Sequence, residues 1–305
     1  MKAKDMFPKL AANVVSPWRS TEWAERKGLL EVVAFFASGV AGGAWLVSLY
    51  FYESGLLISL LIGLIVGGGG HLLVLGRPLR FWRMIVRPQS SWVSRGLIGI
   101  GIFSLAGILY LIPLYFSGMP WTASTPFGNA MLVLSVVGAI WMFTYSGFAF
   151  SFARGIASWN TPVLPLLHIV CGLRGGSGLL LLIISISGST VFEKLQIANF
   201  WAVVASAILV VVYLAWMNGS GINTKRSALI MIYGKESVAF YLGVVAVGMV
   251  IPLVWGAIGF TAPLSLVASG TIGAATVIGN FFIHYSVARS GIYLPFVSQT
   301  QRLSI

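Results

Sequence analysis

Long apolar runs separated by short polar stretches dominate the chain, and hydrophobic residues make up 58% of its 305 residues. A helix needs about 20 consecutive apolar residues to cross a bilayer, and several runs of that length are present. Because a backbone in lipid must satisfy its own hydrogen bonds, each run is expected to be helical. The pattern predicts eight membrane spans, at about residues 29–51, 55–75, 96–117, 129–153, 162–187, 195–217, 235–258 and 263–288.

These spans predict an all-α integral membrane protein whose eight helices form two four-helix bundles. Residues 1–28, in which Trp18 and Trp23 lie among lysines and arginines, are expected to lie at the membrane interface. Residues 29–155 are expected to form the first bundle and residues 156–290 the second, followed by a C-terminal tail at 291–305.

A glycine pattern suggests that the two bundles are an internal repeat. FFASGVAGGAWLVSL (35–49) aligns without gaps with HIVCGLRGGSGLLLL (168–182), and the two segments share glycines at 39/172, 42/175 and 43/176. Four spans separate the segments, so both copies would have the same membrane orientation. The alternative is that small residues at this spacing only let two helices approach closely.

Positive charge is distributed unevenly between the two sides of the predicted membrane protein. The chain has 19 lysines and arginines, and 17 of them fall on the side that holds both termini. The segment GRPLRFWRMIVRPQSSWVSR (76–95) contributes five arginines and no acidic residue. The positive-inside rule therefore predicts that both termini and this segment, the arginine loop, are cytoplasmic, although a docking surface can be basic for its own reasons.

Ionisable side chains within the spans are candidates for function because their burial in a membrane is costly. Five lie in the half next to the arginine loop: Glu31, His71, Tyr145, His168 and His284. Arg174 is expected near the midplane, in a second bundle that we otherwise expect to be nearly free of polar groups. Each also has a structural interpretation: an acid at a helix start, a packed aromatic, a hydrogen-bonded histidine, or an arginine clamp between helices.

The shallow cluster fits quinone chemistry. A quinone needs an apolar slot, hydrogen-bond donors at its carbonyls and a proton route to water, which Tyr, His and Glu side chains can supply. His71 and His168 could instead bind a haem if their helices face each other. The single cysteine, Cys171, cannot form a disulfide within the chain or ligate an iron–sulfur cluster alone. We therefore expect no iron–sulfur cluster within this chain. The chain has only three histidines, and they show no pairing in the sequence, so we expect no haem either.

Four segments resemble the NrfD/polysulfide-reductase membrane-anchor family. They are LGRPLRFWRMIVRPQSSWVSRG (75–96), SGVAGG (38–43), TYSGFAFS (144–151) and SWNTPVLP (158–165). The resemblance covers the whole chain in span count and is sharpest over residues 31–186. The membrane anchors of dimethyl-sulfoxide reductases share a similar loop, so the subfamily stays open.

The resemblance implies a quinone-reactive subunit of a respiratory complex in a bacterial or archaeal cell (inner) membrane, with menaquinone or ubiquinone as the quinone. It implies a ferredoxin-like iron–sulfur partner and often a molybdopterin catalytic subunit beyond it, and no nucleic acid. The family's quinone pocket lies in the first bundle, where Tyr145 and Glu31 occupy motif positions. A histidine of some relatives falls at Ala34 here, and our own inference is that His71 substitutes for it.

The remaining site predictions concern docking and protons. Partner docking is assigned to the arginine loop, through Arg77, Arg80, Arg83, Arg87 and Trp92. A possible proton path is assigned to His168 and Arg174. Many relatives serve periplasmic enzymes, whereas the charge count here predicts a cytoplasmic partner. The alternatives are a structural anchor without quinone chemistry and a proton or ion transporter, and the chain alone is not expected to turn over substrate.

Overall fold

The computed structural model describes residues 18–19, 23, 25, 27–75, 77–189 and 193–294. Eight helical segments in this part of the chain are long and apolar enough to cross a membrane. They are α2 (Lys27–Phe51), α3–η2–α4 (Gly55–Leu61, Ile62–Gly68, Gly69–Val74), α6 (Trp92–Tyr115), α7 (Pro126–Ser151), α8 (Val163–Ser187), α9 (Glu193–Gly219), η4–α11 (Ala239–Val250, Ile251–Gly259) and α12 (Leu266–Ser290). The prediction of an all-helical membrane protein with eight spans is confirmed.

The helix ends follow from local capping. Ser91 accepts a hydrogen bond from the Ser94 amide, so α6 begins at Trp92 rather than at residue 96. Thr125 caps α7 in the same way, and Pro126 occupies its first position, where a missing N–H costs nothing. Gly188 ends α8 in a left-handed conformation, with φ of 68°.

Short elements gather at the end of the molecule that holds the arginine loop. The loop contains η3 (Pro78–Arg80) and α5 (Trp82–Ile85), and α10 (Ile222–Ile232) joins α9 to η4. Strand β1 (Trp18–Arg19) pairs antiparallel with β2 (Ile292–Tyr293). Within the described parts of the predicted interfacial segment, the Trp23 indole donates to the Tyr293 hydroxyl at 2.6 Å and packs edge-on against Trp159.

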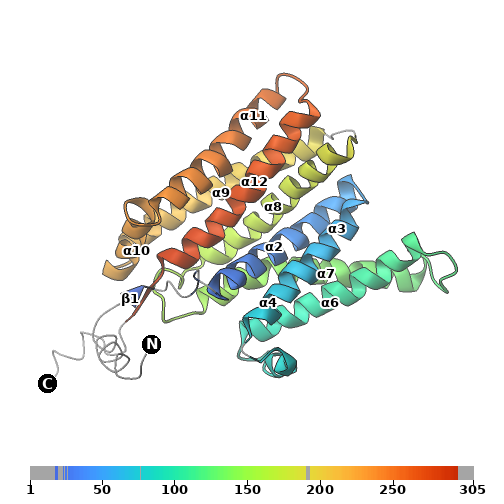
Figure 1. The fold of residues 1–305 in the computed structure, drawn as a ribbon, viewed down its shortest axis with the longest axis horizontal. Helices are drawn as coiled ribbons and strands as arrows, with labels where there is room; N and C mark the ends of the chain where they lie inside the picture. The colour runs from blue at the N-terminus through green and yellow to red at the C-terminus, as the bar shows by residue number, and fades with distance from the viewer. Residues whose placement is uncertain are drawn as a thin grey trace.

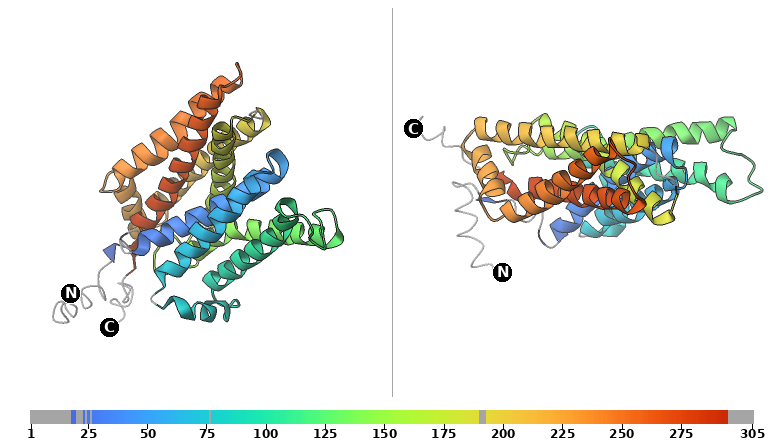
Figure 2. Two further views of the ribbon diagram at one scale, coloured as in Figure 1. Left: turned by 45° about the vertical axis from the view of Figure 1, so that its right-hand side comes forward. Right: turned by 90° about the horizontal axis from the view of Figure 1, so that it is seen from above.

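Helices α2 and α8 lie side by side in the middle of the molecule (Figures 1 and 2). On one side α7 contacts both of them and also packs against α6, and on the other α12 and α9 pack on α8. The two aligned glycine segments face each other here: a Cβ on Gly43 would lie 1.9 Å from the Gly172 carbonyl oxygen. Close approach of α2 and α8 therefore accounts for Gly43 and Gly176, whereas an added Cβ on Gly39 would meet nothing within 4 Å. The internal repeat and the division into two bundles stay predictions.

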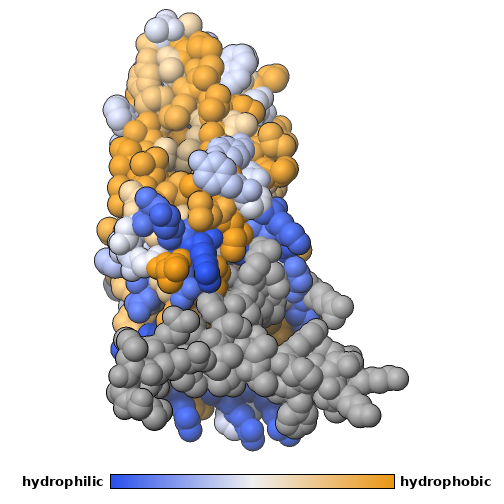
Figure 3. All heavy atoms as spheres, turned by 90° about the vertical axis from the view of Figure 1, so that its left-hand side faces the viewer, coloured by the Kyte–Doolittle hydropathy of each residue, from blue (hydrophilic) through white to orange (hydrophobic). Residues whose placement is uncertain are grey.

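The face drawn in Figure 3 is mostly apolar over its upper part, and polar residues lie lower in the view. Large exposed hydrophobic side chains occur on most of the spans, including Leu105, Val133 and Val211. A contiguous apolar surface of this kind is typical of contact with lipid. The fold thus presents the arginine-loop end to water and the helix walls to the bilayer.

Candidate functional site

Three of the predicted site residues meet in one buried cluster. Glu31 comes from α2, His71 from α4 and Tyr145 from α7. His71 Nδ1 lies 3.2 Å from Glu31 Oε1, and His71 Nε2 lies 2.5 Å from the Tyr145 hydroxyl. The tautomer with its proton on Nδ1, facing the carboxylate, leaves Nε2 to accept the Tyr145 proton. The three side chains form a continuous line joined by one ion-pair contact and one hydrogen bond, called here the Glu–His–Tyr cluster.

Small residues bring the three helices of the cluster together. A Cβ on Gly70 would lie 2.9 Å from the Cβ of Ala34, so α4 crosses α2 closely beside His71. A Cβ on Gly96 would lie 2.2 Å from Tyr145 Cδ2, so α6 leaves the space that the tyrosine ring fills. His71 thus reaches Tyr145 from the second span, past the position that holds Ala34.

A small cavity adjoins the cluster. It has a volume of about 80 Å³, and its walls include Glu31 and Phe35 of α2, Val93 of α6 and Phe150 of α7. The Phe35 ring packs 5.0 Å from the His71 ring and 5.6 Å from the Tyr145 ring. Since Val93 lies in the last part of the arginine loop, the cavity lies beside that loop. One carboxylate, Glu31, therefore faces both the cavity and the histidine.

His168 belongs to a second cluster and does not meet His71. Its Nδ1 lies 2.9 Å from the hydroxyl of Ser146, and its ring lies 4.6 Å from that of His284. His168 Nε2 is buried without a hydrogen-bond partner among the described residues. Ring contacts lead from His71 through Phe35 and Phe150 to His168, so two phenylalanine rings lie along the route between the histidines.

Arg174 joins three helices in the middle of the protein. The residue is fully buried, and its guanidinium donates to the Ser206 hydroxyl of α9 at 3.2 Å and to the Gly248 carbonyl of η4. No carboxylate pairs with it in the described ranges. Its Nε is also left without a partner there. A buried cation held only by neutral acceptors is costly, which sets Arg174 apart from the other basic residues.

The second bundle holds more polar groups than the sequence predicted. Asn199 donates to the Ser177 hydroxyl at 2.9 Å and accepts from Thr276 at 3.3 Å. The side-chain amide of Asn280 is buried without a partner among the described residues. The expectation that the second bundle is nearly free of polar groups was wrong, because it considered only ionisable side chains. The asparagines within the apolar runs could have indicated these buried polar groups from the sequence.

The arginine loop is exposed as a docking surface would be. Its four outward arginines are Arg77, Arg80, Arg83 and Arg87. None of them pairs with a carboxylate within the residues that the structure describes. The neighbouring apolar side chains Leu79 and Trp82 are exposed as well.

Two further residues of this loop hold its end in place. The Trp92 ring is half-buried and stacks on Phe148 at 4.5 Å, with the Arg95 guanidinium 4.4 Å from its centre. Arg95 also donates to the carbonyls of Pro88 and Gln89. Docking through Trp92 stays a prediction, and its observed contacts are within the chain.

Eight apolar helices with a buried polar cluster near one end define a polytopic helical membrane protein. The family model described as polysulphide reductase, NrfD, matches residues 28–293. The chain therefore belongs to the NrfD/polysulphide reductase family.

Three characterised proteins are similar to the chain. The C component of the polysulfide reductase of Wolinella succinogenes is 28% identical over 218 residues, which cover 64% of this chain and 68% of that protein. Protein NrfD of Escherichia coli (strain K12) is 23% identical over 260 residues, or 73% of this chain and 80% of that protein. The C component of the sulfite dehydrogenase of Allochromatium vinosum is 28% identical over 135 residues, which cover 41% of this chain and 40% of that protein.

Proposed function

We propose that this chain is the quinone-reactive membrane subunit of an oxidoreductase complex. The observation that carries the proposal is the Glu–His–Tyr cluster, which joins three spans beside a cavity near the arginine loop. Family membership supports it, since the names of two relatives denote components of a reductase and a dehydrogenase. The oxidised quinone takes up two electrons and two protons, or the quinol releases them.

The cluster is suited to move a proton at a quinone oxygen. In quinol oxidation, the Tyr145 oxygen accepts a proton from a quinol hydroxyl as its own proton passes to His71 Nε2, and His71 gives its Nδ1 proton to Glu31. In quinone reduction, the same transfers run in reverse, from a protonated Glu31 through His71 to Tyr145. Glu31 also faces the cavity, so it can exchange protons with water that enters from the arginine-loop side.

The side chains around the cavity have the chemical groups that a quinone head group needs, but the cavity is small for it. A hydroxyl, an imidazole and a carboxylate supply donors and acceptors, and Phe35 and Phe150 supply flat apolar walls. The cavity of about 80 Å³ is smaller than usual ligand pockets, which begin at roughly 300 Å³. Binding of menaquinone or ubiquinone therefore requires the side chains of the cavity wall to move apart.

The alternative of a haem between His71 and His168 is less well supported. Both ring nitrogens of His71 already have partners within the chain, and a metal ligand needs a free one. A purely structural anchor would need no line of contacting ionisable groups beside a cavity. We therefore favour the quinone over both alternatives.

Electrons must enter or leave through a partner, which we place on the arginine loop. The exposed arginines suit an acidic surface, and the loop joins the cavity at Val93, which would keep the electron path short. The proposed partner is a ferredoxin-like iron–sulfur subunit, with a molybdopterin subunit beyond it. The charge count favours the cytoplasmic side of a bacterial or archaeal cell membrane.

To test this proposal, the rate of quinone-dependent electron transfer by the intact complex in membranes is compared between the wild type and Glu31→Gln. Loss of the carboxylate is expected to slow the rate at least tenfold, because one acid–base group typically contributes on the order of 10²–10⁴. Glu53→Gln, in an exposed turn between α2 and α3, is the matched control and should be unchanged. An unchanged rate of electron transfer in Glu31→Gln argues against the proposal. If the variant assembles less complex but each assembled complex transfers electrons at the normal rate, a structural anchor is favoured.

We also propose that the second bundle carries protons between the quinone site and the other membrane face. Polar groups follow one another along α8, α9 and α12: His168 with His284, Arg174 with Ser206, and Ser177 with Asn199. The series continues to Gln196, which donates to Ser269 at 2.9 Å and lines an open cavity of about 280 Å³ at the far face. Buried polar atoms without partners in the described chain suit bridging water.

Proton release and uptake by proteoliposomes during quinone turnover test this path. Arg174→Leu and His168→Leu are expected to lower the protons moved per electron while electron transfer in detergent persists. If both variants leave quinone chemistry and proton movement unchanged, the path is wrong. Asn280→Leu checks the same path without removing the arginine clamp between helices.

A further inference from the structure

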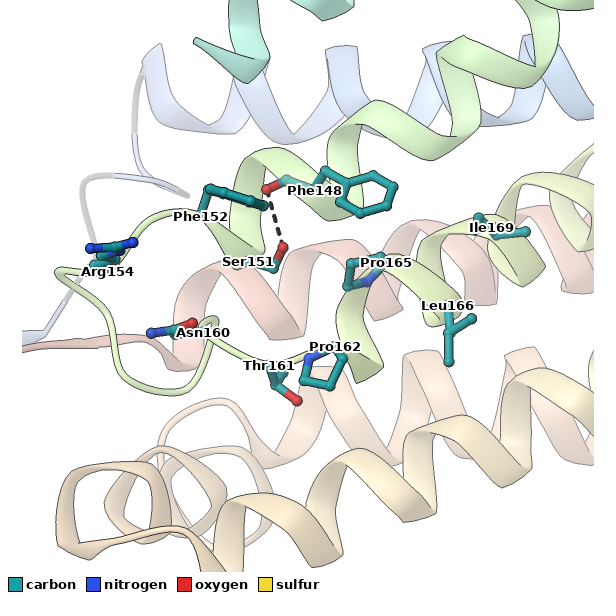
Figure 4. A pocket seen from close by; sticks show the side chains of 10 residues that line it. All are labelled: Phe148, Ser151, Phe152, Arg154, Asn160, Thr161, Pro162, Pro165, Leu166 and Ile169. Carbon is teal, nitrogen blue, oxygen red and sulfur yellow. Dashed lines mark hydrogen bonds between the residues drawn. The ribbon is translucent and has the colours of Figure 1, made fainter. Parts of the chain in front are cut away.

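A large cleft lies outside the proposed quinone site. It has a volume of about 590 Å³ and opens where α7 ends and α8 begins. Figure 4 shows its lining side chains on the two helices and on the loop between them. Part of the SWNTPVLP segment, from Asn160 to Pro165, forms one wall, and the proposed quinone chemistry gives this segment no role.

The cleft is polar at one end and apolar at the other. Arg154 and Asn160 lie on the connecting loop, whereas Leu166 and Ile169 lie further along α8, opposite Phe148 of α7 (Figure 4). Arg154 and Asn160 are exposed. Among the described residues, no carboxylate and no hydrogen-bond acceptor is paired with the Arg154 side chain. The cleft thus offers an unpaired cation at the membrane edge and an apolar channel beneath it.

We propose that this cleft binds an anionic phospholipid, with its phosphate on Arg154 and an acyl chain along α7 and α8. A guanidinium binds phosphate oxygens in a planar, two-pronged geometry, and the Asn160 amide can add a further donor. A formal net charge of +12 attracts anionic lipid to the protein as a whole. The volume lies within the roughly 300–1,000 Å³ of clefts that hold small molecules.

A quinone is a poorer match for the same cleft. Its carbonyls are neutral, and they gain less from a permanent cation than a phosphate does. Glu31, His71 and Tyr145 are not among the lining residues. This lipid site is separate from the proposed function and does not depend on it.

Native mass spectrometry of the intact complex tests the proposal, after detergent extraction and addition of phosphatidylglycerol or phosphatidylcholine. The wild type is expected to retain one phosphatidylglycerol in preference to phosphatidylcholine. Arg154→Gln should weaken that binding on the order of tenfold, as expected for loss of a charged hydrogen-bond donor. Arg226→Gln removes the same charge from an exposed position on α10, at the same end of the molecule and outside the cleft, and should leave binding unchanged.

A second variant tests the apolar half of the cleft. Leu166→Trp fills the channel from an exposed position of α8 and should reduce phosphatidylglycerol binding without affecting the fold. Equal retention of both lipids by the wild type would overturn the proposal. Equal losses in Arg154→Gln and Arg226→Gln would also overturn it, since they indicate attraction to net charge. Displacement of the bound lipid by a quinone analogue would assign the cleft to quinone instead.

Discussion

Gly96 determines where the ring of Tyr145 can lie. This glycine of α6 packs directly against the ring, and a Cβ there would come within 2.3 Å of both Cδ2 and Cε2. The helix cannot accept a side chain at this position unless the tyrosine moves. The hydrogen bond from Tyr145 to His71 therefore depends on a residue that carries no chemistry of its own.

Gly96→Ala is accordingly expected to displace the Tyr145 ring and to slow quinone-dependent electron transfer several-fold. Overpacking should also cost about 1–3 kcal/mol of stability. The matched control is Gly101→Ala, on the same helix, where an added Cβ meets nothing within 4 Å. Equal electron transfer in the two variants would mean that the tyrosine's position does not matter to the activity.

The sequence predicted the members of the Glu–His–Tyr cluster, but not all of the buried polar groups around it. Glu31 and Tyr145 came from the family resemblance, and His71 from its depth in the second span. Ser146 was not predicted as a partner of His168, because a serine in an apolar helix usually bonds to its own backbone. Which neighbouring helix a side chain faces cannot be read from depth alone.

At the scale of elements, the crossing of α2 and α8 holds the centre of the molecule. A Cβ on Gly176 would lie 2.2 Å from the backbone nitrogen of Ala44, so the two helices touch along their backbones. Association of helices in lipid relies on such close packing, because apolar surface gains little by leaving the lipid tails.

Gly43→Ala is predicted to push these two helices apart and to lower the thermal stability of the purified protein. The expected loss is about 1–3 kcal/mol, the usual cost of an extra methyl in a filled core. Gly39→Ala lies one turn away in the same segment, where an added Cβ meets nothing within 4 Å, and should be neutral or slightly stabilising. Similar melting temperatures for both variants would contradict a backbone contact at Gly43.

The number of membrane spans could be predicted from the lengths of the apolar runs alone, whereas the π-helical segments inside the spans could not. The π-helical segments η2 and η4 lie within runs that are apolar at nearly every position, so no period marks a change in winding. Helix α10 falls between the predicted spans at 195–217 and 235–258, where no helix was predicted. Its buried side is formed by Thr224, Ser227, Ala228 and Met231, which are too few and too small to give a strong signal.

At the scale of the whole molecule, charge and chemistry lie at the same end. The arginine loop, the Glu–His–Tyr cluster and the cavity beside Val93 adjoin one another, while Arg174 lies deeper in the second bundle. A quinone site alone would not need the four exposed arginines of the loop. The acidic partner proposed above, which would bring an electron carrier close to the quinone, would account for them.

The pair Arg80→Glu and Arg83→Glu is predicted to weaken binding of the partner subunit about tenfold at low salt, with a smaller difference at high salt. Co-purification and titration of the partner against the membrane subunit measure this. Lys225→Glu with Arg226→Glu makes the same charge change on α10, at the same end of the molecule, and should have little effect. Equal weakening by both pairs would indicate general charge attraction and no specific docking on the loop.

The most direct test of the central claim is the binding of a quinone analogue to the solubilised complex, comparing the wild type with Tyr145→Phe. Loss of one hydroxyl hydrogen bond should weaken binding about three- to tenfold while assembly stays intact. Tyr110→Phe, which changes another buried tyrosine that packs against Trp45, should bind like the wild type. Equal binding by wild type and Tyr145→Phe would contradict a quinone site at the Glu–His–Tyr cluster.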